Sequence, residues 1–269
     1  MKNAAASAVG TVCTPSAATV VAAALRDGAI ELPVLPRVAQ EVMVVARDSS
    51  RGAAEVARLV ERDPALCATV LRAANSAIYG GSVEIVSARQ AVLRLGLVEV
   101  ATLATTAAMR SALVDHGPFA AALTCWWRRA LTTGLYAKEI ARLRRQAVDS
   151  AFLCGLLRDV GEPVVLRVLA RAHVEVGDGV DAVIAEFRRA AGTLLCDAWQ
   201  LGGAVRAVVT EDVEPPWGDH VATARLADAF ARLATPSPTD AAALNLYPED
   251  LEVIAAKTPT IVASVESMS

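Results

Sequence analysis

The clearest candidates for chemistry are two adjacent opposite charges, Arg158 and Asp159, at the end of an apolar segment. The stretch AFLCGLLRDVGEPVV, residues 151–165, is hydrophobic up to these two residues, and Gly161 follows them closely. Charges in apolar surroundings need partners, so one interpretation is a structural ion pair. The other is a pocket for an anion or a nucleotide, in which the guanidinium binds phosphate. We favour the structural interpretation because buried charges need partners whatever the function.

Other catalytic patterns are absent from the sequence. There is no glycine-rich phosphate loop, no G-x-S-x-G motif and no H-E-x-x-H motif. The only histidines are His116, His173 and His220, and none is followed by an aspartate. The five cysteines stand singly in apolar stretches, which is typical of buried thiols in a reducing compartment. We therefore expect no metal site and no cofactor.

A second polar pair, Asn75 and Ser76, interrupts the helical pattern of DPALCATVLRAANSAIYGG, residues 63–81. Both side chains can hydrogen-bond backbone groups, so they can close the helix and fix the turn that follows. Alternatively, they face a second lobe and join the two lobes through buried hydrogen bonds, or they contribute to a surface for a partner. Of these alternatives we favour the first, in which the pair closes the helix and fixes the turn.

Composition bounds the remaining possibilities. The chain has 269 residues, is 54% hydrophobic and carries a formal net charge of −3, so it can bury a large core and has no overall attraction to nucleic acid. Residues 87–110 have the outline of a helix-turn-helix. The second helix, which starts at Leu97, lacks side chains that read bases and carries an acid, Glu99, where phosphates would lie. No uncharged run makes a good membrane span. We expect a cytoplasmic protein that neither binds nucleic acid nor inserts into a membrane.

The elements that must position the charged pair are helices. Apolar residues recur at helical spacing along most of the chain, and no alternating run is bounded by hairpin turns. Asp63 with Pro64 opens one predicted helix, and Ser87 caps another. The fold class is therefore all-α, and we expect a two-lobed helical bundle whose lobes share one core. The expected parts are a flexible N-terminus at 1–16, an N-terminal lobe at 17–116, a second lobe at 117–235 and a C-terminal helical segment at 236–269.

Several segments together resemble the HDOD family of bacterial signalling domains. In chain order they are LPVLP, LVERDPALCATVLRAANSAIYG, SARQAVLRLGLVEV, CWWRRALTTGLYAKEIA, AFLCGLLRDVG and LADAFARLA. The match covers roughly residues 30–235, and its motifs are specific in combination. The resemblance implies that residues 17–235 form one HDOD domain with a second lobe like that of HD-type metal phosphohydrolases.

The same resemblance places non-ligand residues at the metal positions of HD enzymes. Arg158 stands where the histidine of the His-Asp pair would be, and only Asp159 and Asp228 remain as ligands. The other metal positions hold Arg128, Arg129, Glu211 and Asp212. Since a guanidinium does not deprotonate to bind a cation, we expect a degenerate metal site and no hydrolase activity.

These positions also suggest partners for the charged pair. Neighbours on a helix point about 100° apart, so the two side chains need not contact each other. We expect Asp159 to contact Arg128 or Arg129. We expect Arg158 to contact Glu211 or Asp212. The expected function is a non-catalytic signal-transduction regulator or scaffold that binds an as yet unidentified signalling protein. The alternative is a sensor that binds a nucleotide or another phosphate ligand through Arg158 and Arg128.

Overall fold

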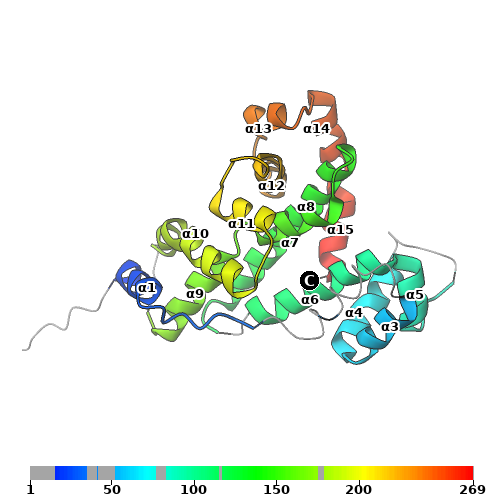
Figure 1. Ribbon diagram of the computed structural model, residues 1–269, viewed down its shortest axis with the longest axis horizontal. Coiled ribbons are helices and arrows are strands. Elements are labelled where there is room, and N and C mark those ends of the chain that lie inside the picture. The colour runs from blue at the N-terminus through cyan, green and yellow to red at the C-terminus, as the bar shows by residue number, and fades with distance from the viewer. Residues whose placement is uncertain are drawn as a thin grey trace, which may run out of the picture.

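The structure is a computed structural model that describes residues 16–34, 41, 52–76, 83–114, 117–174 and 179–268. Within these ranges every regular element is an α-helix, which confirms the all-α prediction. The helices are arranged in two lobes (Figure 1). The predicted flexible N-terminus lies outside the described residues except for Ser16, whose side chain caps the first described helix.

Among the described residues, three short helices and part of a longer one build the N-terminal lobe. They are α3 (Ala53–Glu61), α4 (Pro64–Ala74), α5 (Ala88–Leu95) and α6 (Leu97–Leu113). Asp63 caps α4 by accepting hydrogen bonds from two backbone N–H groups at 2.9 and 3.1 Å, and Ser87 caps α5, as predicted. Between α5 and α6 the chain turns by 112° at Gly96, whose φ of +84° suits glycine.

The second lobe is built around its longest helix. Its main helices are α7 (Ala120–Leu143), α8 (Val148–Leu157), α9 (Gly161–Arg171), α10 (Val180–Ala198), α11 (Gly203–Thr210) and α12 (Gly218–Ala231). α7 packs against both α8 and α12. α9 and α10 meet backbone to backbone, because a Cβ on Gly161 would lie 1.7 Å from the carbonyl oxygen of Arg188. This contact brings α10 next to the turn that carries Arg158 and Asp159.

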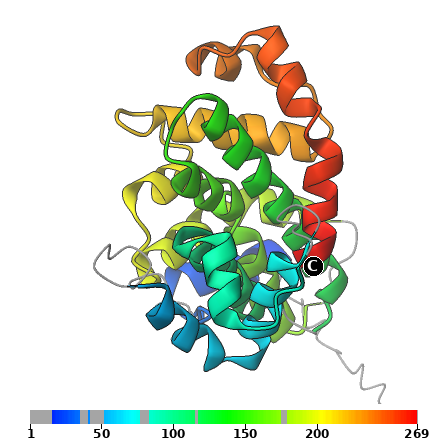
Figure 2. The same ribbon diagram turned by 90° about the vertical axis from the view of Figure 1, so that its right-hand side faces the viewer.

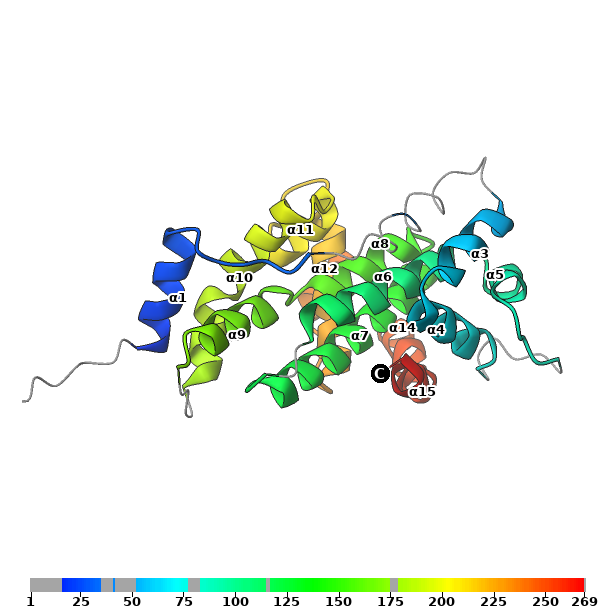
Figure 3. The same ribbon diagram turned by 90° about the horizontal axis from the view of Figure 1, so that it is seen from below.

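The first described helix, α1 (Ala17–Arg26), packs against α9 and α10 of the second lobe. It therefore lies at the opposite end of the molecule from α3 and α5 (Figure 3). The predicted N-terminal lobe, residues 17–116, includes α1, whereas in the structure α1 packs on the second lobe. Its apolar face, with Val21 only 1% exposed, completes the core of the second lobe. Trp199 fixes the chain that follows, by donating from Nε1 to the carbonyl oxygen of Pro33 at 2.7 Å.

The C-terminal segment is also integrated into the fold. It contains α13 (Pro238–Ala243), α14 (Pro248–Ala255) and α15 (Thr258–Met268). Ile254 and Ile261 are buried in the core of the second lobe. α15 runs back toward the N-terminal lobe and packs against both α7 and α4 (Figure 2). Tyr136 of α7 fixes its start through a hydrogen bond of 2.6 Å between the Tyr136 and Thr258 hydroxyls.

The two lobes have separate hydrophobic cores, contrary to the expectation of one shared core. α6 contributes to both, because Val100, Leu103 and Ala104 lie in the N-terminal core whereas Met109 and Leu113 lie in the other. The lobes are further joined by an ion pair between Lys138 of α7 and Glu99 of α6, at 2.6 Å. The change from one core to the other thus falls inside α6 and not at residue 116.

Among the described residues, no single helix is long and apolar enough to cross a membrane. α5 and α6 meet the length and composition requirement only as a pair, and they are bent by 112° relative to each other. Several side chains of α6 are buried in the two protein cores. The absence of membrane insertion and the cytoplasmic location stay predictions.

Candidate functional site

Arg158 and Asp159 lie in the short turn between α8 and α9. Both side chains are largely buried, with exposed fractions of 12% and 10%. The turn is anchored by Trp126 of α7, whose Nε1 donates to the carbonyl oxygen of Asp159 at 3.1 Å. The apolar residues before the turn thus carry two charges into the interior of the second lobe.

Three carboxylates converge on the guanidinium of Arg158. Its Nη1 lies 3.0 Å from Asp159 Oδ2 and 3.2 Å from Asp228 Oδ2, and its Nη2 lies 3.4 Å from Glu211 Oε1. Glu211 follows α11 with a φ of +58°, and Asp228 lies on α12. Carboxylates from three parts of the chain therefore surround one buried cation.

Four further arginines surround these carboxylates. Arg188 pairs with Asp159 and lies 3.7 Å from Glu211, and Arg232 contacts Asp228 at 2.9 Å and Asp159 at 3.3 Å. The other two, Arg189 and Arg225, both contact Glu211. Each carboxylate thus faces at least two guanidinium groups. We call this set the Arg158 network; its members are Arg158, Asp159, Arg188, Arg189, Glu211, Arg225, Asp228 and Arg232.

Ionisation near the network reflects burial and neighbouring charge. Burial raises the pKa of the Glu162 carboxyl, and the nearby Arg129, with which it forms an ion pair, only partly opposes that rise. Burial lowers the pKa of Arg232, but the carboxylates around it, Asp228 first and then Asp159 and Glu162, together outweigh burial and raise that pKa. Arg232 therefore stays protonated and remains a fixed positive charge at the edge of the network.

The donor set does not suit a metal ion. Among the described residues, no group of three or more histidine, cysteine, aspartate or glutamate side chains is arranged to hold one. The three carboxylates of the network are instead bound to arginines, which cannot act as ligands. His173 and His220 belong to no such group, and His116 lies outside the described residues. In this structure the carboxylates of the network are therefore paired with arginines and are not free to act as metal ligands.

The structure brings together only part of the predicted site. Arg158, Asp159 and Glu211 meet as members of one network, and the predicted contact between Arg158 and Glu211 is present. The other predicted partners lie elsewhere. Arg128 is exposed on α7, and Asp212 is exposed and accepts from the backbone N–H of Glu214 at 3.0 Å.

The prediction of the partner of Asp159 was wrong. Neither Arg128 nor Arg129 contacts Asp159. Arg129 pairs instead with Glu162, one turn farther along the chain. Asp159 instead contacts its neighbour Arg158, although side chains one residue apart on a regular helix diverge. The pair can meet because it lies in the turn after α8, outside regular helix.

The arginines that complete the network were not predicted. Arg188, Arg189, Arg225 and Arg232 are absent from the site residues proposed from the sequence. One signal was present, since Asp228 and Arg232 are four residues apart and so share a helix face. Nothing in the spacing could have placed α10 against the turn at Asp159.

Asn75 and Ser76 lie at the end of α4, away from the network. The Asn75 side chain donates to the carbonyl oxygen of Ile85 and accepts from its backbone N–H, both at 2.8 Å. Ser76 donates to the carbonyl oxygen of Ala73 at 2.8 Å. These bonds close the helix and tie it to the start of the next one. They agree with the turn-fixing interpretation, and Ser76 also borders a small cavity between the lobes.

Known structures share this fold. A candidate metal-dependent phosphohydrolase from Shewanella amazonensis SB2B superimposes with a TM-score of 0.71 at 22% identity, covering 93% of this chain and 96% of that one. An HDOD domain protein of unknown function from Geobacter sulfurreducens gives 0.69 at 23% identity, covering 94% and 98%. A candidate signal transduction protein from Marinobacter aquaeolei VT8 gives 0.66 at 21% identity, covering 94% and 68%. At these identities the likeness establishes the fold.

The sequence comparisons identify the family. An uncharacterized protein of Treponema pallidum (strain Nichols) is 26% identical over 148 residues, which are 54% of this chain but only 28% of that protein. The HDOD domain family matches residues 32–215, and these residues include α4 with its Asn-Ser end and the turn at Arg158. This match covers more than half of the chain and agrees with the two-lobed helical fold. The chain belongs to the HDOD domain family.

Proposed function

We propose that this chain is a non-catalytic regulator in signal transduction that acts by binding a protein partner. The observation that carries the proposal is the convergence of three carboxylates on the buried guanidinium of Arg158. In HD-type enzymes, as the family resemblance implies, metal ligands occupy this region. Here the region is filled by a closed set of ion pairs.

Hydrolysis of a phosphoester at this site would need a group that generates hydroxide. A metal does so by lowering the pKa of bound water, and it needs free carboxylate or imidazole ligands. Asp159, Glu211 and Asp228 are each engaged by two or more arginines. Removing those contacts to admit a metal would leave buried guanidinium groups unpaired, which costs several kcal/mol, on the order of 3 to 5.

A nucleotide would have to compete with the same carboxylates. Of the two arginines predicted to bind phosphate, Arg158 is buried among carboxylates, whereas Arg128 is exposed on α7 and is not a member of the network. The more exposed members of the network, Arg189 and Arg232, are already paired with Glu211 and Asp228. These contacts favour a structural role for the network, and a role in binding a protein partner for the domain that it stabilises.

The catalytic part of the proposal is tested by metal analysis and activity assays. The purified chain is assayed with cyclic dinucleotides and bis(p-nitrophenyl) phosphate, with Mg²⁺, Mn²⁺ or Fe²⁺ added, beside Asp159→Asn. We expect no stoichiometric metal after dialysis and no turnover above that of the variant. Turnover that disappears in Asp159→Asn would contradict the proposal.

The binding part is tested by affinity capture from cells of the native host, followed by reconstitution with purified components. We expect at least one captured protein to form a complex of defined stoichiometry in size-exclusion chromatography. Thermal shift with cyclic and linear nucleotides near millimolar concentration runs in parallel. A nucleotide-dependent shift that is lost in Arg158→Gln, without any reconstituted complex, would favour the phosphate-sensor alternative.

A further inference from the structure

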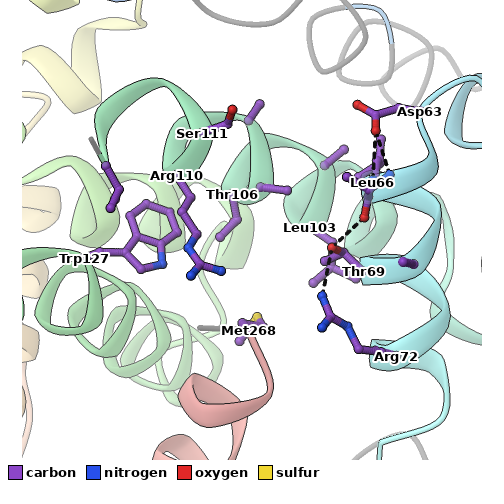
Figure 4. Close-up of a pocket in the computed structure, with 16 residues that line it drawn as sticks. Asp63, Leu66, Thr69, Arg72, Leu103, Thr106, Arg110, Ser111, Trp127 and Met268 are labelled. Atoms are coloured by element: carbon purple, nitrogen blue, oxygen red, sulfur yellow. Dashed lines mark hydrogen bonds between the residues drawn. The ribbon is translucent and has the colours of Figure 1, made fainter. Parts of the chain in front are cut away.

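A cavity of about 630 Å³ lies between the two lobes, and no member of the Arg158 network lines it. α4 and α6 of the N-terminal lobe form its walls (Figure 4). Trp127 of α7 and Met268 of α15 close it from the second lobe. Its volume falls within the range of small-molecule sites, roughly 300 to 1,000 Å³.

The walls of the cavity are mostly apolar, with a few polar groups at defined places. The lining includes Leu66, Leu103 and several alanines of α4 and α6. Two of the polar side chains already serve the helices: Asp63 caps α4, and the Thr106 hydroxyl donates to the backbone of its own helix at 2.7 Å. A ligand would therefore meet an apolar surface and those polar side chains that are not already hydrogen-bonded to a helix backbone.

The two arginines of the cavity are such groups. Among the described residues, neither Arg72 nor Arg110 contacts a carboxylate, and the one recorded side-chain contact is between Arg72 Nη2 and Thr69 Oγ1, at 3.5 Å. Both arginines are exposed at the cavity rim. The charge of Arg110 is unmatched inside the cavity, because the carboxylate of Asp63 lies on the α4 side, away from Arg110 (Figure 4).

Trp127 supplies an independent observation. Its side chain is only 2% exposed, and its Nε1 has no hydrogen-bond partner among the described residues. An indole nitrogen can only donate, and a buried donor without an acceptor is destabilising. Figure 4 shows this nitrogen on the side of the ring where the Arg110 guanidinium lies. The cavity lining thus holds two donors, Trp127 Nε1 and the Arg110 guanidinium, for which the described residues supply no acceptor.

We propose that this cavity binds a small amphipathic carboxylate. The carboxylate accepts from the guanidinium of Arg110 and from Trp127 Nε1, and the alkyl or aryl body lies against the apolar walls. Arg110 is exposed, so its side chain can move aside to admit the anion between the two donors. A nucleotide fits less well, because the buried ring of Trp127 offers no free face for stacking a base.

The location of the cavity gives the ligand an effect on the lobes. A molecule held by α4, α6, α7 and the end of α15 contacts both lobes at once. It would stabilise their present arrangement, since ligands that bind one state favour it by mass action. This inference concerns a different site from the Arg158 network and holds whether or not the proposed protein partner exists.

Calorimetric titration of the full chain with sodium octanoate and sodium 4-phenylbutyrate tests the proposal. Octanamide has the body without the charge, acetate has the charge without the body, and inorganic phosphate and AMP test other anions. We expect saturable binding of at least one of the two acids, and at least tenfold weaker binding of octanamide and acetate. Failure of both acids to bind, or tighter binding of phosphate or AMP, would overturn the proposal.

Variants place the binding in this cavity. Arg110→Gln is expected to weaken binding at least tenfold, whereas Arg58→Gln, an exposed substitution on α3 outside the cavity, leaves it unchanged. The ¹H–¹⁵N spectrum of the four tryptophan indoles gives a second readout. The indole signal of Trp127, assigned by its loss in Trp127→Phe, should shift when octanoate or 4-phenylbutyrate is added. Binding that is equal in both arginine variants, with no indole shift, would contradict the assignment.

Discussion

Arginine serves two different purposes in the two regions described above. In the Arg158 network every carboxylate faces at least two guanidinium groups, and the central pair is about nine-tenths buried. In the cavity between the lobes, Arg72 and Arg110 face no carboxylate among the described residues, and both are exposed at the rim. The same side chain is thus a structural element in one place and an available binding group in the other.

The difference follows from desolvation. A guanidinium taken out of water must recover its hydration energy from partners, so burial and pairing occur together. An exposed guanidinium keeps its water and remains free to bind an anion that arrives later. We therefore expect substitutions in the network to affect chiefly stability, and substitutions in the cavity to affect chiefly binding.

The strongest test of this contrast is the loss of an arginine from each region. Arg158→Ala leaves Asp159, Glu211 and Asp228 without their shared partner, and breaking a buried ion pair costs about 3 to 5 kcal/mol. Arg110→Ala removes an exposed side chain and should change the free energy of unfolding by less than about 0.5 kcal/mol. Urea unfolding of both variants measures the difference. If Arg158→Ala lowers the free energy of unfolding by only a few tenths of a kcal/mol, the network is solvent-facing and the structural role is wrong.

The second test breaks the helix contact that assembles the network. In Gly161→Ala the new Cβ would lie 1.7 Å from the carbonyl oxygen of Arg188, so α9 and α10 must separate and Arg188 must move away from Asp159. Overpacking typically costs about 1 to 3 kcal/mol, and a clash with backbone places this variant at the upper end. Gly202→Ala is the matched control, because nothing lies within 4 Å of its Cβ position. Equal unfolding midpoints for the two variants would contradict the close approach.

The residues show how far sequence reasoning reached. Helices and caps were predictable because their signals are local, as at Asp63 and Ser87, and the charged pair stood out against its apolar helix. The partners of that pair were not predictable, because they depend on which helices touch. Nothing in the sequence around Gly161 indicated that α10 packs against this glycine. The packing of α1 on the second lobe likewise depends on tertiary contacts alone. The cavity arginines became distinguishable only when their lack of partners was visible.

The third test concerns a polar group outside both regions. Asn75→Ala removes the acceptor of the Ile85 backbone N–H and the donor to the Ile85 carbonyl oxygen. Ile85 is only 8% exposed. A loss of about 1 to 3 kcal/mol is expected, because buried backbone groups would be left unpaired. Ser76→Ala should cost less, about 0.5 to 1 kcal/mol, since it removes one local hydrogen bond. If thermal unfolding ranks the two variants in the opposite order, Asn75 does not hold the turn.

The smallest effect is a pH dependence next to the network. Burial raises the pKa of Glu162, so above the ordinary glutamate pKa of about 4.3 the folded state holds this proton more tightly than the unfolded state does. Stability contributed by this group therefore falls as pH rises from that value through the raised pKa. Glu162→Gln removes the titration while keeping the shape of the side chain. We expect the free energy of unfolding of the wild type, minus that of the variant, to decrease over this window in urea titrations.

The sign of that difference measures which of two opposing effects dominates. Arg129 pairs with Glu162 and favours its charged form, whereas burial and the nearby charge of Asp159 favour the neutral form. If the wild type instead gains stability relative to Glu162→Gln as pH rises, the ion pair outweighs burial. Glu162 and Arg129 would then behave as the network members do, and the boundary of the paired region would extend from the Arg158 turn onto α7.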